Sequence, residues 1–189
     1  MAEPNASGQA TIEDLYLVDG KAELVGGEIV HTPPTGFMPG SAAGEVFASL
    51  REHARRTRAG RAIGDNVAFR VELPGRQSFS PDASWWTGPT SGMKFLEGAP
   101  AFAIEIRSEG DCGPAAERAM AAKRADYFAA GTLAVWDVDL LDPIATVRVH
   151  EAARPDAPRR FGRGETADAG EAVPGWSMPV DELFADIES

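Results

Sequence analysis

The sequence predicts an α/β fold, in which helices flank a mixed, twisted sheet and a β-hairpin precedes them. Three observations predict it. Two short β-prone runs surround Gly26-Gly27, the stretch 41–59 has apolar residues at helical spacing, and strand-like apolar runs then alternate with one further helical stretch. With 189 residues, we expect one domain, residues 11–189, after a small and polar segment, residues 1–10, that we expect to be flexible.

A short helix, a hairpin and a long helix are expected first. Thr11 is a suitable N-cap for the short helix. The run KAELVGGEIVHT, residues 21–32, has the pattern of two strands joined by a two-residue turn. Val46 and Leu50 lie on one face of the long helix, which Gly60 ends.

Strands and a second long helix follow. Strands are expected at 61–73, 79–86, 101–108, 132–140 and 144–150, with a short edge strand at 159–161. The segment 87–100 is rich in glycine and proline and is expected to be a loop, with room for one helical turn at 93–97. Pro114 suits the first turn of the second long helix, and Gly131 closes it. A short helix at 181–187 ends the chain.

Composition and charge exclude several classes of protein. The net charge of −11 argues against a protein that coats nucleic acid non-specifically, but metal ions can neutralise carboxylates and phosphates together in an enzyme. The single cysteine, Cys112, excludes an intrachain disulfide and a zinc site built from several thiolates. The sequence shows no signal peptide and no apolar run long enough to span a membrane, so we expect a cytoplasmic protein.

The strand expected at AFAIEIRS carries a carboxylate at its centre. Side chains alternate between the two faces of a strand, so Phe102, Ile104 and Ile106 point to one face. Glu105 and Arg107 then point to the other. A carboxylate inside an apolar strand is costly to bury unless a cation pairs with it.

A second carboxylate and a lysine have similar settings. Asp82 follows a proline at the start of an apolar strand. At 100° per residue, Lys123 shares one helix stripe with Met120 and Tyr127. Lys123 can pack its stem and extend its amine to solvent, or it can join the two carboxylates. In the second case, Asp82 and Glu105 would form a divalent-metal site.

Other charged residues lie on the first long helix. Arg51, Arg55 and Arg58 are expected on one face near its end. They form either a solvated face that complements the negative helix terminus or a patch that contacts phosphates. Glu45 is either solvated or a contributor of a further carboxylate to the site.

Several short motifs occur in a characteristic order. They are P-D-A-S-W (81–85), E-I-R-S (105–108), K-R-A-D-Y (123–127), V-W-D-V-D (135–139) and V-P-G-W-S-M-P (173–179). Over about residues 11–187, the chain resembles the Uma2 family of putative restriction endonucleases, within the PD-(D/E)XK nuclease superfamily.

The resemblance implies a restriction-endonuclease-like fold and a metal-dependent endonuclease that hydrolyses DNA phosphodiester bonds. It implies that Asp82 and Glu105 bind Mg²⁺, with Mn²⁺ able to substitute. The superfamily's usual lysine position, two residues after the glutamate, holds Arg107, which cannot act as a base. The lysine role therefore falls to Lys123, with Tyr127 orienting it and Arg107 as a phosphate contact.

The resemblance also implies DNA as the substrate and gives no membrane role. Cutting both strands needs two active sites, which is consistent with a homodimer. The alternative is a catalytically weak or inactive member that acts as a binding or assembly module. The acidic net charge and Arg107 favour this alternative, whereas the presence of Asp82, Glu105 and Lys123 favours an enzyme.

Overall fold

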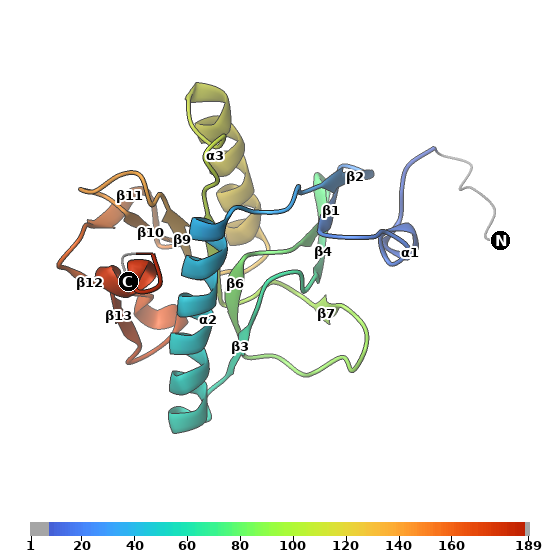
Figure 1. Ribbon diagram of the computed structural model, residues 1–189. Coiled ribbons are helices and arrows are strands. Elements are labelled where there is room, and N and C mark those ends of the chain that lie inside the picture. The colour runs from blue at the N-terminus through green and yellow to red at the C-terminus, as the bar shows by residue number, and fades with distance from the viewer. Residues whose placement is uncertain (1–7, 188–189) are drawn as a thin grey trace.

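A six-stranded sheet forms the centre of the molecule in the computed structural model, which describes residues 8–187 (Figure 1). In spatial order its strands are β11 (Arg154–Phe161), β10 (Val147–Glu151), β9 (Ala134–Val138), β8 (Phe102–Ile106), β6 (Ala83–Trp86) and β3 (Arg61–Ile63). Strands β8 and β9 run parallel, and the other neighbouring pairs run antiparallel. The predicted mixed sheet is therefore confirmed.

The two long helices, α2 (Phe37–Thr57) and α3 (Pro114–Ala129), pack on opposite faces of this sheet. Tyr127 of α3 is fully buried in a cluster with Ala103 of β8 and Val135 of β9. Alternate residues of these two strands face α2 instead, as the strand period requires. The sheet is thus covered on both sides, and both strand faces are buried.

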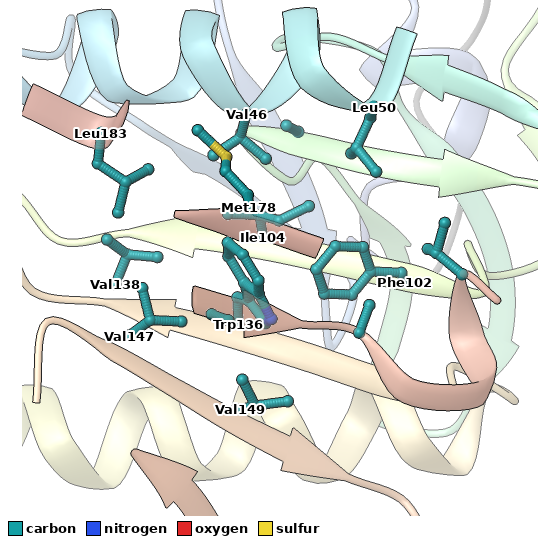
Figure 2. Packing of buried hydrophobic residues seen from close by; sticks show 14 of the residues in the cluster. Val46, Leu50, Phe102, Ile104, Trp136, Val138, Val147, Val149, Met178 and Leu183 are labelled. Atoms are coloured by element: carbon teal, nitrogen blue, oxygen red, sulfur yellow. The ribbon is translucent and has the colours of Figure 1, made fainter. Parts of the chain in front are cut away.

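The larger core lies between the sheet and α2, where Val46 and Leu50 descend from the helix towards Phe102, Ile104 and Trp136 (Figure 2). These five side chains are at most 1% exposed. The C-terminal segment closes the same core with β12 (Thr166–Asp168), η1 (Gly170–Ala172), β13 (Ser177–Pro179) and η2 (Val180–Phe184).

The predicted N-terminal hairpin is confirmed and lies on the other side of α2 from this C-terminal segment (Figure 1). It consists of β1 (Ala22–Val25) and β2 (Glu28–His31). Gly26 and Gly27 have φ angles of 59° and 80°, which a two-residue hairpin turn of this kind requires and glycine adopts without strain. The Leu24 backbone N–H donates to Ser78 Oγ at 2.7 Å, which fixes β1 against the next sheet.

That next sheet has three strands, in the order β5 (Arg76–Phe79), β4 (Phe69–Leu73) and β7 (Leu96–Glu97). Before the hairpin, α1 (Ile12–Leu15) begins at the predicted cap, where the Asp14 N–H donates to Thr11 and the Asp14 carboxylate accepts from the Thr11 N–H. The charged groups described below lie where β1, the start of β6, β8 and α3 meet.

Two predictions are wrong, for the strand at 61–73 and the helical turn at 93–97, and the strand expected at 79–86 is shorter, because Phe79 ends β5 and β6 begins at Ala83. The segment 61–73 forms two strands in different sheets, β3 and β4, because the chain turns at Asp65 and at Asn66, whose φ is 59°. Asparagine tolerates this left-handed conformation better than most residues, so a turn divides the run into two strands. The helical turn expected at 93–97 is replaced by β7, which pairs parallel with β4.

Helix boundaries differ from the predictions at the ends. Helix α2 starts four residues earlier than expected, at Phe37, and ends at Thr57. The last helix, expected at 181–187, is the 3-10 segment η2. Residues 1–7 of the expected flexible segment lie outside the described residues, and the Ala10 N–H donates to Gly27 O at 2.7 Å. Across residues 8–187, no helix combines the length and the apolar character needed to cross a bilayer.

Candidate active site

Asp82 lies in the connection from β5 to β6 and is fixed to the neighbouring central strand. Its backbone N–H donates to Ile104 O at 3.0 Å, and its Oδ2 accepts from the Ile106 N–H at 2.8 Å. Its Oδ1 lies 2.5 Å from Lys21 Nζ. The carboxylate orientation is therefore set by the β8 backbone, while a lysine supplies the opposite charge.

Glu105 is the fourth residue of β8 and points away from the α2 core, as the strand alternation predicts. Lys123 Nζ lies 2.8 Å from Oε1 and 2.9 Å from Oε2, and Tyr127 OH donates to Oε1 at 2.7 Å. Burial raises the pKa of the Glu105 carboxyl, Lys123 opposes this increase, and the negative charges of Asp82 and Glu23 add to it. An additional cation near this carboxylate would relieve the repulsion.

Lys123 lies half-buried on the expected stripe of α3, and its amine is directed to carboxylates of the protein. Besides Glu105, its amine contacts Glu23 Oε1 at 3.0 Å. Burial alone would lower the pKa of Lys123, but the attraction of Glu105 and Glu23 outweighs burial, so the pKa lies above the ordinary value. The amine is therefore a stable positive charge, better suited to stabilising negative charge than to accepting a proton.

Glu23 of β1 is a site residue that the sequence reasoning missed. Its Oε1 accepts from the Ser80 N–H at 2.8 Å, and its Oε2 accepts from Arg76 at 2.6 Å. The sequence signal that identified Glu105, a carboxylate within an apolar strand, is also present at Glu23, which lies between the buried Ala22 and Leu24. The same argument about buried charge would have selected it.

Lys21 and Asp65 were also missed. Lys21 directly precedes β1, and its Nζ lies 2.6 Å from Asp65 Oδ1 as well as 2.5 Å from Asp82. Both residues lie outside strands and helices, so no periodicity marks them in the sequence. Only the fold, which packs β1 near the start of β6, brings them to the site.

These charged groups line one cavity of about 830 Å³. Its charged lining residues are Asp19, Lys21, Asp65, Asp82, Glu105, Arg107, Asp111 and Lys123. A smaller cavity of about 210 Å³ shares Asp65 and Asp82 with it and is walled by the N-terminal half of α2, including Gly40 and Phe47. The structure thus brings Asp82, Glu105 and Lys123 together, and Tyr127 supports them by its bond to Glu105.

Arg107 lines the same cavity but is engaged by carboxylates of the protein. It donates to both oxygens of Asp137, at 2.7 and 2.8 Å, and also contacts Glu117. Arg124 reaches Asp137 as well, at 3.0 Å. The hydrogen bonds to Asp137 and Glu117 raise the pKa of Arg107, so its charge is permanent. The role of Arg107 as a phosphate contact remains a prediction, and Asp137 and Glu117 would compete with a phosphate for its donors.

The charged residues of α2 lie apart from these groups. Glu45 is half-buried and is not among the residues that line either cavity. Arg51 and Arg55 are exposed, and Arg55 lies about 16 Å along the helix from Gly44 at the cavity wall. The prediction that Arg58 shares a helix face with Arg51 and Arg55 is wrong, because α2 ends at Thr57 and Arg58 adopts a left-handed φ of 57°.

Tyr127→Phe tests how Glu105 is oriented. The variant removes one buried hydrogen bond and keeps the stacking of the ring on Phe79, so we expect the metal-free protein to lose about 1 kcal/mol of unfolding free energy. Any cleavage activity should fall by about tenfold, because Glu105 loses one of its two orienting partners. Denaturant unfolding and cleavage rates measure the two effects. A Tyr16→Phe variant is the matched control for cleavage, because it also removes one tyrosine hydrogen bond, from the Phe95 N–H, but at an exposed residue outside the cavity.

The donor set fits magnesium better than zinc. Asp82 and Glu105 offer hard carboxylate oxygens, and within residues 8–187 there is no group of three or more histidine, cysteine, aspartate or glutamate side chains arranged to hold a metal ion. Zinc sites need three or four such ligands, whereas Mg²⁺ is usually held by one or two carboxylates plus water and phosphate oxygens.

Comparison with known proteins agrees with this fold. The family model described as "Uma2: Putative restriction endonuclease" matches residues 11–181. Among solved structures, the chain is similar to a putative nuclease belonging to DUF820 from Anabaena variabilis ATCC 29413, with a TM-score of 0.71 and 17% sequence identity. The match covers 92% of this chain and 97% of that one, and at such low identity it shows the fold alone. The comparison with curated proteins gives no match.

Proposed function

This chain belongs to the Uma2 family of putative restriction endonucleases, and from this premise we propose that it is a metal-dependent endonuclease hydrolysing DNA phosphodiester bonds. The observation that carries the proposal is the convergence of Asp82, Glu105 and Lys123 on one cavity. Phosphodiester hydrolysis needs an activated water and compensation for charge on the phosphate, and these residue types can supply or support both.

In the proposed site, Asp82 and Glu105 would hold Mg²⁺, or Mn²⁺ in its place. Such an ion, when bound, would polarise the phosphate and lower the pKa of a coordinated water. The protein fixes both carboxylates through neutral donors, the Ile106 N–H for Asp82 and the Tyr127 hydroxyl for Glu105. These bonds are independent of the lysines and would keep the carboxylates oriented.

Lys123 would stabilise the negative charge that develops on the phosphate oxygens. Its amine is already positioned by Glu105 and Glu23, so little reorganisation is needed during the reaction. Because its pKa is raised, we assign it charge stabilisation and not the removal of a proton from water. The proposed substrate, DNA, would approach through the open side of the cavity that these residues line.

A second function has one observation in its favour. All four carboxylate oxygens of Asp82 and Glu105 already have protein partners, as expected for an inactive relative whose lysines replace the metal. In that case the chain would be a binding or assembly module. The excess of acidic residues in the sequence agrees with it, since such a surface repels DNA.

Calorimetric titration with Mn²⁺ and Mg²⁺, combined with cleavage of supercoiled plasmid and of a linear duplex, separates the two functions. The proposed nuclease should bind Mn²⁺ and nick or cut the DNA, and EDTA should abolish cutting. An Asp82→Asn variant carried through the same purification is the control for contaminating nucleases. Cleavage that persists in this variant, or in EDTA, would contradict the proposal.

The arginines at the end of α2 give a prediction about DNA binding. Because Arg51, Arg55 and Arg58 are exposed and separate from the cavity, neutralising all three to glutamine should weaken DNA binding without changing turnover at saturating substrate. The slope of log affinity against log salt should fall by roughly 0.9 for each lost phosphate contact. Arg160→Gln, on the exposed edge strand β11, is the control. An unchanged slope in the triple variant would make these arginines a solvated face only.

A further inference from the structure

Lysines are a small minority of the basic residues of this chain, and most of them lie at the candidate site. The sequence has 18 basic residues, and its lysines are Lys21, Lys94 and Lys123. Two of these three reach the candidate site, one on each proposed metal ligand. Lys94 is exposed in the loop before β7. Lys123 was expected from the sequence, whereas Lys21 has no assigned role.

The Lys21 amine lies between two carboxylates at nearly equal distances. Its Nζ is 2.5 Å from Asp82 Oδ1 and 2.6 Å from Asp65 Oδ1. The side chain of Lys21 is 15% exposed, that of Asp82 22% and that of Asp65 49%. One partner is therefore the proposed metal ligand, and the other is a more exposed carboxylate at the side of the cavity.

We propose that Lys21 determines how tightly the site binds its divalent ion. Its ammonium neutralises Asp82 while no ion is present, and it retains Asp65 as its partner when an ion takes Asp82 Oδ1. The inference rests on the proposed function, because it concerns the ion that a nuclease would use.

The geometry allows this exchange with little movement. Asp82 Oδ2 is held by the Ile106 N–H, so the carboxylate stays in place whichever cation contacts Oδ1. Lys21 does not lose its only partner on displacement, since Asp65 already accepts from it at 2.6 Å. A short shift of a flexible side chain is therefore sufficient, without any change in β1 or β6.

The expected cost is a lower apparent affinity for the ion. When a binding-competent state is only partly populated, the apparent affinity falls by that fraction. The displaced ammonium also remains near the ion and repels it. A lysine suits this role better than an arginine, because a single ammonium on a flexible stem moves more readily than a guanidinium fixed by two parallel hydrogen bonds.

Lys21→Met tests the inference by metal affinity alone. Mn²⁺ titration calorimetry should show binding about three- to thirtyfold tighter than in the wild type, with Lys94→Met unchanged. Lys94→Met is the matched control because it removes the same charge from an exposed site outside the cavity. In EDTA, Lys21→Met should have a lower Tm than the wild type, and Mn²⁺ should raise its Tm by more. Lys21→Gln provides a second variant should the methionine not fold.

Asp65→Asn tests the alternative partner in a double-mutant cycle. In the wild-type background, the substitution should weaken Mn²⁺ binding, because displaced Lys21 loses its remaining partner. In the Lys21→Met background the same substitution should have a clearly smaller effect. Equal effects of Asp65→Asn in both backgrounds would overturn the exchange between Asp82 and Asp65.

The results separate this inference from the proposed function. Wild-type binding of Mn²⁺ with no tightening in Lys21→Met would overturn the role of Lys21 and leave the nuclease proposal intact. Binding in Lys21→Met but not in the wild type would support the role of Lys21 strongly. Absence of binding in both would overturn the inference and the metal-dependent function together.

Discussion

Asp82→Asn and Glu105→Gln should each reduce metal-dependent DNA cleavage by more than about a thousandfold. Each variant replaces a proposed charged ligand by a neutral amide of the same shape. A metal ion contributes several kcal/mol of charge stabilisation to a phosphoryl transition state only while the protein holds it. Steady-state cleavage of a labelled duplex at saturating Mg²⁺ measures the loss. Calorimetry should show that Mn²⁺ affinity falls in the same variants.

Stability measurements distinguish this loss from unfolding. The pKa of Glu105 is raised in the folded protein, so its ionised form opposes folding above the pKa of the unfolded chain, and this cost grows as the pH rises towards the folded pKa. Glu105→Gln removes that cost but also leaves Lys123 with Glu23 as its acidic partner. We therefore expect the metal-free variant to remain folded in EDTA at neutral pH by circular dichroism. A wild-type cleavage rate in either variant would remove the substituted residue from the mechanism.

The part of the site that could be predicted follows local periodicity. Strand alternation placed Glu105 opposite Ile104, and Ile104 is fully buried in the α2 core while Glu105 faces α3. The helical spacing of 100° per residue likewise placed Lys123 and Tyr127 on one stripe, and both contact Glu105. In each case one element with a clear period fixed where the side chains point.

The part that could not be predicted depends on contacts between distant segments. Lys21 and Asp82 are 61 residues apart, and Arg76 and Glu23 are 53 apart. No pattern within one element indicates that β1 lies beside β5. The division of 61–73 between two sheets was missed for the same reason, because each half has strand propensity and only the sheet pairing separates them.

These contacts make the N-terminal hairpin a part of the site. Glu23 in β1 contacts Lys123, and Lys21, immediately before β1, contacts Asp82. One short segment therefore supplies a lysine to Asp82 and a glutamate to Lys123. Although the net charge of the chain is −11, two lysines therefore lie among the carboxylates of the cavity in which we propose that a phosphate binds.

Lys123→Met should reduce turnover by about two to three orders of magnitude, the usual loss when one preorganised donor that stabilises developing negative charge is removed. Methionine keeps most of the stem packing near Tyr127, and the loss of a positive charge beside Glu105 should leave Mn²⁺ affinity equal or tighter. Without metal, the loss of the cation shared by Glu105 and Glu23 should also cost about 3 kcal/mol of stability. Single-turnover cleavage at saturating Mn²⁺ isolates the chemical step. Arg107→Met is the comparison, and since it breaks a buried ion pair with Asp137 we expect it to cost about 3 kcal/mol of stability and little turnover.

Lys123→Arg decides which role the lysine has. Arginine carries a permanent charge and cannot accept a proton, so a charge-stabilising residue should be partly replaced by it and a general base should not. Because Glu105 and Glu23 raise the pKa of Lys123, we expect the turnover of Lys123→Arg to be at least tenfold higher than that of Lys123→Met. The pH–rate profile of the wild type should then show no rise that follows deprotonation of this amine. An arginine variant as slow as the methionine variant, with intact metal binding and stability, would instead assign Lys123 to proton transfer.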